Sequence, residues 1–302
     1  MKNYSTSPQP EEEILLANIL VDALPYIQSY RDKTVLIKFG GSAMENPELV
    51  RALMKDIVLM EALGLNPVVV HGGGKAISRA LVECGQESRF VNGLRVTPAE
   101  VVDVVERTLS GTINPELVSL ARQAGGKAVG IPGPNVFVGE RIVERDTEGN
   151  PLDIGMVGEV IGTQLARVQE ALDLQITPII SPLARELGTR QSLNVNADLA
   201  AAALARELRP VKLIYISDVP GLLRDPADPS SLIRSINRKE AMELIAEGVI
   251  TGGMIPKVRS AIEALNAGVR KVHFIDGRLP HTLLLEIFTS EGIGTEIIRE
   301  QR

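Results

Sequence analysis

Cysteine, histidine and tryptophan are scarce in this chain. Its 302 residues include one cysteine, three histidines and no tryptophan, and only 3% of the residues are aromatic. The single thiol, on Cys84, cannot close a disulfide bond within the chain. These counts are also too low for a structural zinc site made of cysteine and histidine, and we expect no metal-binding residues.

An excess of positive charge and a long apolar run are missing too. Lysine and arginine total 32 against 38 for aspartate and glutamate, a net charge of −6. Neither nucleic acid nor an anionic membrane is therefore expected as a partner. The longest apolar run, residues 199–205, falls far short of the ~18 residues that a membrane span needs. The acidic start of the chain does not resemble a signal peptide, so we expect a cytoplasmic protein.

The rest of the composition is that of a globular protein, with 44% hydrophobic and 23% charged residues. The length indicates about two domains. Short apolar runs typical of strands recur at residues 35–39, 68–70, 128–131, 176–181, 211–216 and 271–275. Such runs suit strands that are buried on both faces, as in a parallel sheet covered by helices. We predict an open α/β sheet with right-handed crossovers.

Residues typical of helix starts lie between these runs. Asn46 and Asn114 each stand before a proline, which favours an N-cap followed by the first helical residue. Thr97 and Asn237 are each followed three residues later by glutamate, the pattern of a capping box. We predict a helix start at all four positions.

Two regions interrupt the alternation of strands and helices. Residues 136–138 and 142–145 predict a short antiparallel hairpin that projects from the sheet. Residues 183–192 are polar and predict an irregular segment. We place the boundary between two lobes just before it, after Ser181.

A helical stripe of apolar residues precedes the first predicted strand. Leu15, Ile19, Ala23 and Ile27 recur at helical spacing, and Pro25 should kink or break the helix. Such a stripe is buried either on the chain's own domain, which the residues alone favour, or on a neighbouring chain.

Glycine-rich turns end the first two predicted strands. Gly40 and Gly41 follow Lys38 closely, and three glycines at 72–74 follow the second strand directly. Glycines allow the backbone to turn tightly and to present N–H groups to an anion, and both turns should meet at one edge of the sheet. They could be ordinary strand-to-helix turns, but two together favour a phosphate or oxyanion site.

Single polar residues near these turns have simpler interpretations. Lys38 alone would be a solvated strand-end lysine, Arg95 a surface ion pair, and Asn196 or Asp198 a helix cap. His71 could be a general base, but its place between a strand and three glycines favours a positioned core histidine. No P-loop motif of the form G-x-x-x-x-G-K-[ST] and no dinucleotide-binding G-x-G-x-x-G follows a strand.

Six motifs in a fixed order carry a resemblance to a known family. They are K-F-G-G (38–41), H-G-G-G-K (71–75), N-G-L-R-V-T (92–97), N-V-N-A-D (194–198), S-D-V-P-G-L (217–222) and G-G-M-I-P-K (252–257). From about residue 33 to residue 298 the chain resembles the amino acid kinase superfamily, most closely the N-acetyl-L-glutamate kinases of arginine biosynthesis. The resemblance implies a three-layer α/β/α sandwich with an added, kinked N-terminal helix. It also implies a division into the helix (1–32), an acyl-acceptor lobe (33–181) and an ATP lobe (182–302).

Phosphoryl transfer from MgATP to a carboxylate is the activity that the resemblance implies, with the Mg²⁺ held by nucleotide phosphates. The positions that match catalytic residues are Lys38, Asp198 and Lys257. Those that match acceptor-binding residues are Gly41, Gly72, Gly73, Arg95, Asn194 and Asn196. Those that match nucleotide-binding residues are Gly40, Ser217, Asp218 and Gly253. The two lysines would neutralise the phosphoryl group, Asp198 would hold both lysines, and Arg95 would bind the α-carboxylate of the acceptor.

The two ends of the chain resemble those of arginine-inhibited, hexameric members of the family. The candidate effector residues are His273, Glu286, Gly292 and Gly294. The resemblance implies arginine as an allosteric inhibitor and a homo-hexamer, a trimer of dimers whose N-terminal helices interlace. Some relatives are relieved of inhibition by a PII signalling protein, and no feature of this sequence decides whether that partner applies.

The chain departs from the family pattern in two segments. Gly133-Pro134-Asn135 replaces the usual Gly-Lys-Asp-Gly, and residues 183–190 differ from the usual glycine-rich connector. Two other functions stay open beside the one that the resemblance implies. One alternative function is the N-acetyl-aminoadipate kinase of lysine biosynthesis, whose substrate is one methylene longer. The other is a non-catalytic arginine sensor with the same fold.

Overall fold

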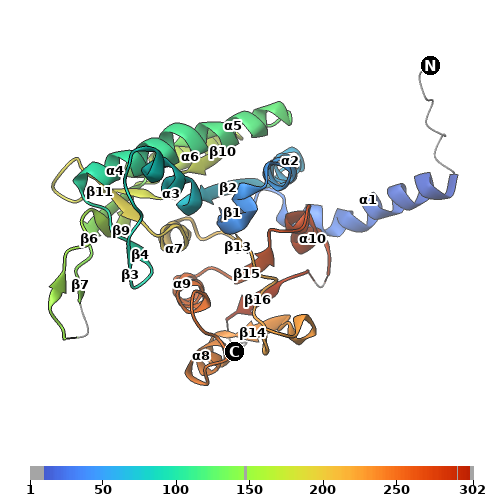
Figure 1. The fold of residues 1–302 in the computed structure, drawn as a ribbon. Helices are drawn as coiled ribbons and strands as arrows, with labels where there is room; N and C mark the ends of the chain where they lie inside the picture. Colours follow the sequence, from blue (N-terminus) through green and yellow to red (C-terminus); the bar gives the residue numbers. More distant parts are fainter. Residues whose placement is uncertain (1–9, 146–147, 291, 300–302) are drawn as a thin grey trace, which may run out of the picture.

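The structure is a computed structural model that describes residues 10–145, 148–290 and 292–299. An eight-stranded sheet lies at its centre, in the order β14-β16-β15-β13-β1-β2-β10-β5 (Figure 1). Its strands are β1 (Thr34–Phe39), β2 (Asn66–His71), β5 (Ala128–Ile131), β10 (Thr177–Ile180), β13 (Lys212–Ser217), β14 (Ser235–Asn237), β15 (Lys271–Asp276) and β16 (Thr295–Ile298). The six strands that the sequence predicts are the six that run parallel, whereas β14 and β16 run in the opposite direction.

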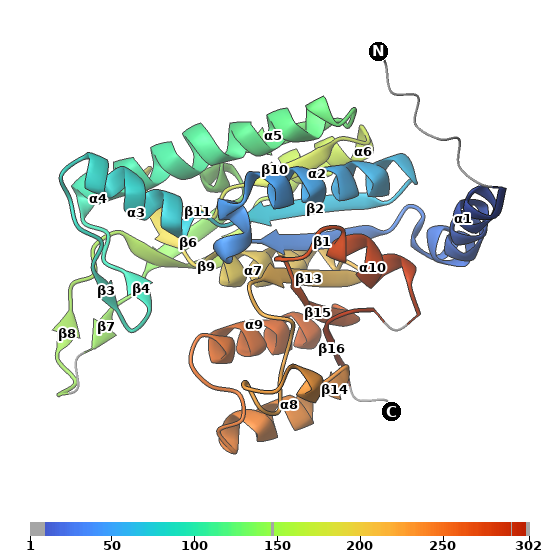
Figure 2. The same ribbon diagram turned by 45° about the vertical axis from the view of Figure 1, so that its right-hand side comes forward.

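Helices cover both faces of this sheet (Figure 2), and the predicted three-layer α/β/α fold is confirmed. They are α1 (Pro10–Tyr30), α2 (Pro47–Ala62), α3 (Gly74–Glu83), α4 (Ala99–Glu106), α5 (Asn114–Gln123), α6 (Ala166–Asp173), α7 (Ala197–Leu208), α8 (Arg238–Ala246), α9 (Met254–Asn266) and α10 (Thr282–Phe288). One buried core joins the sheet to α6, α7, α8 and α9. The other joins it to α2, α3, α4, α5 and α10.

The alternation of side chains along β1 determines which face Lys38 reaches. Leu36 belongs to the core beneath α7, whereas Ile37 belongs to the core on the opposite face. Successive side chains of a strand point to opposite faces, so Lys38 shares the face of Leu36 and of α7. The first residues of α7 therefore lie on the side of the sheet to which Lys38 points.

A second, closed sheet lies beside the main one and corrects two predictions. It consists of β6 (Phe137–Arg141), β9 (Val157–Thr163), β11 (Leu183–Glu186) and β12 (Ser192–Val195). The predicted hairpin is wrong, because β6 pairs with β9, and Glu144–Arg145 (β7) pairs with Pro151–Leu152 (β8). The predicted irregular segment is wrong too, because Leu183 and Ala184 are fully buried in β11, which pairs with β12.

Two of the four predicted helix starts are confirmed together with their caps. The side chain of Asn46 accepts hydrogen bonds from the N–H groups of Glu48 and Leu49 at the start of α2. Asn237 and Glu240 form a reciprocal capping box at the start of α8.

At the other two positions the predicted cap is wrong because each side chain has a different partner, although α4 does begin beside Thr97, at Ala99. The hydroxyl of Thr97 donates to the carbonyl of Arg95 (2.7 Å) and does not cap α4. Asn114 lies inside a continuous helix, since α4 runs through a π-helical segment, Arg107–Ile113, directly into α5.

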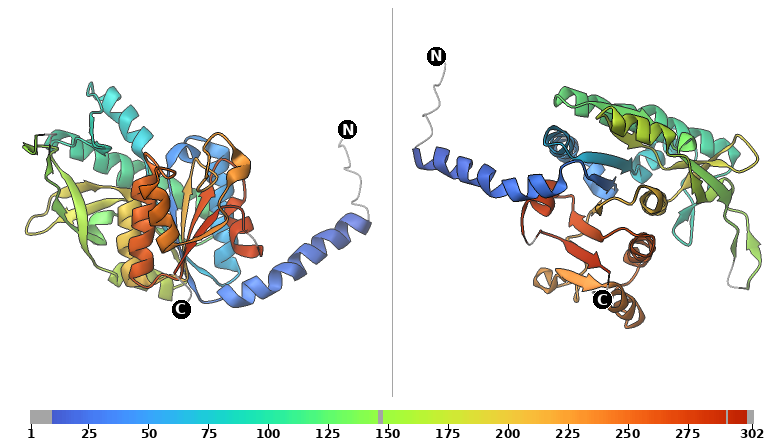
Figure 3. Two further views of the ribbon diagram at one scale, coloured as in Figure 1. Left: turned by 90° about the horizontal axis from the view of Figure 1, so that it is seen from below. Right: turned by 180° about the vertical axis from the view of Figure 1, so that it is seen from behind.

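Helix α1 extends away from the rest of the chain (Figure 3). It continues through Pro25 without a break. The expectation that its own domain buries the apolar stripe is wrong, because Leu15 and Ile19 are 59% and 55% exposed. Its C-terminal end contacts the body next to α10 (Figure 3). Within the described ranges, no helix combines the length and apolar character that crossing a membrane requires.

Candidate active site

The carboxyl ends of the parallel strands bring the two glycine turns together. Gly40 follows β1 and Gly72 follows β2, the neighbouring strand. A Cβ added to Gly72 would lie 3.2 Å from the Cα of Gly40, so the two turns are in close contact. A Cβ on Gly40 would lie 2.7 Å from the Nζ of Lys38, which shows how closely the lysine folds against this turn.

Asp198 joins the two predicted lysines. Its Oδ1 lies 2.7 Å from the Nζ of Lys38, and its Oδ2 lies 2.5 Å from the Nζ of Lys257. Lys38 comes from β1, Asp198 from the first turn of α7, and Lys257 from the first turn of α9. The structure therefore brings the three predicted catalytic residues, 59 or more positions apart, into one cluster.

Burial and the ion pairs together set the charges of this cluster. Burial alone would raise the pKa of Asp198, but the two lysines outweigh it and lower that pKa to about 2. Burial lowers the pKa of Lys38 from its ordinary value, against the attraction of Asp198. The carboxylate is thus ionised across the physiological range and holds two ammonium groups close together.

Asn196 positions Asp198 by capping α7. Its Oδ1 accepts hydrogen bonds from the N–H of Asp198 (2.8 Å) and of Leu199 (3.3 Å). The capping interpretation of Asn196 is therefore confirmed. Its Nδ2 has no partner among the residues that the structure describes, and the side chain also lines a pocket.

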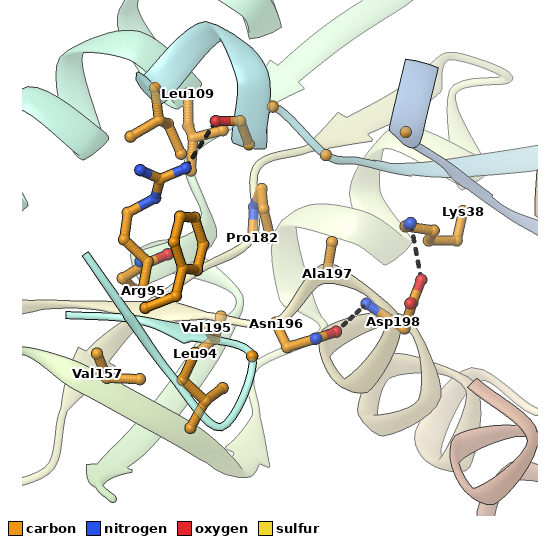
Figure 4. A pocket seen from close by; sticks show the side chains of 18 residues that line it. Lys38, Leu94, Arg95, Leu109, Val157, Pro182, Val195, Asn196, Ala197 and Asp198 are labelled. Atoms are coloured by element: carbon orange, nitrogen blue, oxygen red, sulfur yellow. Dashed lines mark hydrogen bonds and ion pairs between the residues drawn. The ribbon is translucent and has the colours of Figure 1, made fainter. Parts of the chain in front are cut away.

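A pocket of about 240 Å³ opens beside the cluster (Figure 4). It is lined by predicted site residues from both lobes, namely Lys38, Gly41, Gly72, Gly73, Arg95, Asn194, Asn196 and Asp198. Gly74, Phe90 and Leu94 also line it. The nucleotide candidates Gly40, Ser217, Asp218 and Gly253 and the catalytic candidate Lys257 are not among its lining residues.

Arg95 is held at one side of this pocket by the first turn of α3. Its guanidinium donates to the carbonyl of Gly74 (2.7 Å) and to the hydroxyls of Ser78 (3.0 Å) and Ser88, and it lies 4.7 Å from the ring centre of Phe90. Burial lowers its pKa, but a guanidinium stays charged. Two of its five N–H groups have no partner within the described part of the chain and could bind a carboxylate.

The amides of the glycine turns differ in availability. The N–H of Gly72 donates to the carbonyl of Phe39 (2.6 Å) and is not free for a ligand. The N–H groups of Gly40, Gly41, Gly73 and Gly74 have no hydrogen-bond partner in the residues described. Gly74 belongs to the predicted glycine turn but was not among the predicted site residues, although its place as the first residue of α3 favours anion binding.

The nucleotide candidates lie along the same edge of the sheet. Ser217 ends β13 with a buried hydroxyl that has no partner among the described residues. The Asp218 carboxylate lies beside Gly41, 3.7 Å from where a Cβ would stand, and Gly41 has a φ of +78°, which favours glycine. Gly253 precedes α9, the helix that carries Lys257.

The four effector candidates lie in a different pocket of about 570 Å³, next to the end of α1. The Nδ1 of His273 lies 2.5 Å from the Glu286 carboxylate, which also accepts hydrogen bonds from the N–H groups of Ile293 (2.9 Å) and Gly294 (3.2 Å). The wall that faces them includes Tyr26, Tyr30 and Lys212, which sequence reasoning missed.

His71 should make stability depend on pH. Burial lowers its pKa from 6.5 to about 4, so the folded chain keeps it neutral where an unfolded chain binds a proton. The stabilisation is present above pH 6.5 and is lost as the pH falls towards 4, by up to about 3 kcal/mol. Chemical denaturation at several pH values measures the free energy of unfolding. We expect the loss between pH 6.5 and pH 4 in the wild type and not in His71→Asn. Equal pH dependence in both would contradict the buried, neutral state of His71.

Comparison with known proteins agrees with the fold. The model of the amino acid kinase family matches residues 33–276. The acetylglutamate kinase of Akkermansia muciniphila is 71% identical over 286 residues, which cover 95% of this chain and 96% of that protein. The acetylglutamate kinase of Heliobacterium modesticaldum is 47% identical over 290 residues, which cover 94% of this chain and 98% of that protein.

Solved structures show the same architecture. N-acetylglutamate synthase from Neisseria gonorrhoeae aligns with a TM-score of 0.83 at 25% identity, over 95% of this chain and 64% of that longer chain. Carbamate kinase from Giardia lamblia aligns with a TM-score of 0.66 at 19% identity, over 89% of this chain and 99% of that chain, and shares the fold. The chain belongs to the amino acid kinase family and, within it, to the acetylglutamate kinases.

Proposed function

We propose that this kinase transfers the γ-phosphoryl group of ATP to the side-chain carboxylate of N-acetyl-L-glutamate, as in arginine biosynthesis. The observation that carries the proposal is the pair of ammonium groups held by Asp198 beside a pocket that Arg95 also lines. The names of the relatives support the choice of substrate.

Charge is the main obstacle to this reaction. The bond from the γ-phosphorus to the bridging oxygen of ADP breaks, and a bond to a carboxylate oxygen forms, which yields ADP and an acyl phosphate. The carboxylate is already a nucleophile, so no general base is needed. Two unit charges about 4 Å apart repel by roughly 4 kcal/mol at an effective dielectric constant near 20. The ammonium groups of Lys38 and Lys257 offset this repulsion where negative charge spreads over the phosphoryl oxygens.

The glycine amides and Arg95 complete the proposed site. Free N–H groups at Gly41, Gly73 and Gly74 can donate to the phosphoryl and acceptor oxygens. Arg95, at the far side of the pocket, suits the α-carboxylate of the acceptor. Asn194, whose Nδ2 donates to the Thr97 hydroxyl, and Asn196 would assist it.

The nucleotide is proposed to bind along the ends of β13 and α9. Ser217 and Asp218 would contact it, and Gly40 and Gly253 would approach its phosphates, where the N-terminus of α9 favours negative charge. Mg²⁺ would enter with ATP and supply positive charge while held by phosphate oxygens. Both oxygens of Asp198 lie against lysines, so this carboxylate suits the role of positioning the two ammonium groups and not that of a metal ligand.

A hydroxamate assay with MgATP tests the proposal, because hydroxylamine traps acyl phosphates. N-acetyl-L-glutamate should give the highest kcat/KM when compared with N-acetyl-aminoadipate, glutamate and aspartate. One methylene is worth only about 1–3 kcal/mol, so N-acetyl-aminoadipate is the comparison that decides between the two kinase functions. Product from none of the four would favour the non-catalytic sensor.

Arginine is proposed to bind in the second pocket, and α1 to join dimers into a hexamer. That pocket offers carboxylates from Glu286 and Glu296 and an ammonium group from Lys212, which suits a ligand that has a guanidinium and an α-carboxylate.

The exposed apolar stripe of α1, including Leu15 and Ile19, supports burial on a neighbouring copy. A PII partner remains an expectation from the resemblance alone.

Deleting residues 1–30 should yield dimers and raise the arginine concentration needed for half-inhibition by at least about tenfold, since Tyr26 and Tyr30 would be lost from the pocket. Ile19→Asp separates the role of the stripe from that of the tyrosines, because it disrupts the exposed stripe and leaves both tyrosines in place. Sedimentation velocity and arginine titration of the activity measure both effects. Hexamers in the deletion variant, or unchanged inhibition, would contradict the role given to α1.

A further inference from the structure

A series of buried polar groups lies behind the second glycine turn. His71 is fully buried, and its Nδ1 lies 2.7 Å from the carbonyl oxygen of Gly72. Its Nε2 lies 3.2 Å from the Nδ2 of Asn114, and the same Nδ2 lies 2.8 Å from the carbonyl oxygen of Ile179 on β10. A Cβ on Gly130 would overlap the Oδ1 of Asn114, so glycine there leaves room for this side chain.

The direction of every hydrogen bond in this series is determined. A carbonyl oxygen only accepts, so the amide nitrogen of Asn114 is the atom that faces Ile179. The same nitrogen donates its second hydrogen to Nε2 of His71, which must therefore be unprotonated. Nδ1 then carries the proton and donates it to the carbonyl of Gly72. Burial lowers the pKa of His71 to about 4, which maintains this neutral form at physiological pH.

The helix that supplies Asn114 also packs against the glycine turn. A Cβ on Gly73 would lie 2.5 Å from the Cδ2 of Leu109 and 2.6 Å from the Cδ1 of Ile113. Both side chains belong to the π-helical segment Arg107–Ile113, which leads directly into Asn114. Turns of π-helix are rare and occur frequently at functional sites. One segment thus restrains the turn by packing and, through Asn114, by hydrogen bonds.

The peptide group between Gly72 and Gly73 transmits this restraint to the pocket. It is trans, so its C=O and N–H point in opposite directions. With the carbonyl held by His71, the N–H of Gly73 points away from His71, on the side of the pocket that Gly73 lines. We infer that His71, held by Asn114, is a positioning residue that aims the Gly73 amide at the phosphoryl group during transfer. The inference rests on the phosphoryl transfer proposed above.

Two substitutions at His71 separate positioning from general stability. In His71→Asn the side-chain amide replaces Nδ1 and can still donate to the carbonyl of Gly72. In His71→Gln the amide reaches the place of Nε2, where it can still meet Asn114 but leaves that carbonyl without its donor. We expect kcat to fall on the order of 10²-fold in His71→Gln and less than about tenfold in His71→Asn, with the KM of both substrates changed less than about threefold.

Crystal structures of the two variants give a readout that does not depend on activity. The peptide between Gly72 and Gly73 should keep its orientation in His71→Asn and change it in His71→Gln. An unchanged peptide in His71→Gln, or equal kcat values in both variants beside an active wild type, would overturn the inference. An inactive wild type whose peptide responds as expected would overturn the proposed function and leave the positioning of the amide supported.

Discussion

Lys257→Ala and Lys38→Ala are each expected to lower kcat by a factor on the order of 10²–10³ or more. Each removes one of the two ammonium groups that Asp198 holds, that of Lys38 at 2.7 Å or that of Lys257 at 2.5 Å. The developing negative charge of the phosphoryl group then lacks one of its two lysine partners. The loss should fall on kcat, because the attraction grows as charge builds up in the transition state. Steady-state kinetics with MgATP and N-acetyl-L-glutamate measures it.

Lys239→Ala is the matched control for these variants. Lys239 lies on the surface of α8 and, among the described residues, pairs only with Glu243 one turn away, so its loss should leave kcat unchanged. Circular dichroism of all three variants checks that the fold is retained. Wild-type turnover in either Lys38→Ala or Lys257→Ala would refute the roles given to the two lysines.

Arg95→Lys should raise the KM for N-acetyl-L-glutamate by about 10- to 100-fold, since hydrogen bonds to a charged group contribute about 1.5–3 kcal/mol. A lysine cannot bond to Gly74, Ser78 and Ser88 at once while it also presents donors to a carboxylate. The interaction is the same in ground and transition states, so kcat should change by less than about tenfold.

The control for Arg95→Lys is Arg141→Lys. Arg141 pairs with Glu186 on the surface of the closed sheet, away from the pocket. It should leave both constants unchanged. A fall in kcat with unchanged KM in Arg95→Lys would move Arg95 from acceptor binding to the chemistry of transfer.

The parallel strands could be predicted because the sheet buries them on both faces. The run at 35–39 is apolar apart from Lys38, and its neighbours in space are runs of the same kind. The cluster of Lys38, Asp198 and Lys257 could not be derived from spacing, since the three residues meet only through the fold. Its prediction depended on the ordered motifs, and the roles of these residues stay predictions.

The wrong helix caps arose where a polar side chain bonds to a partner outside the helix start. Thr97 matches a capping box in sequence, but its hydroxyl bonds to Arg95 and Asn194. Asn114 looks like a helix start before proline, but it reaches β10 and His71 from within a helix. Local patterns describe competition between neighbouring backbone groups, and they contain no information on partners that tertiary packing brings close.

The stripe on α1 shows a different limit. Its spacing predicts an amphipathic helix correctly, but spacing does not say which surface covers the apolar side. The exposure of Leu15 and Ile19, at 59% and 55%, excludes the chain's own body as the surface that covers this part of the stripe.

The most direct test of the proposed chemistry is a crystal structure with MgADP, aluminium fluoride and N-acetyl-L-glutamate, in which the planar fluoride mimics the phosphoryl group in transfer. We expect the Nζ atoms of Lys38 and Lys257 to lie within hydrogen-bond reach of the fluorides on opposite sides, with Asp198 still between them. A closed complex in which either ammonium group points away from the fluoride would contradict the proposed chemistry.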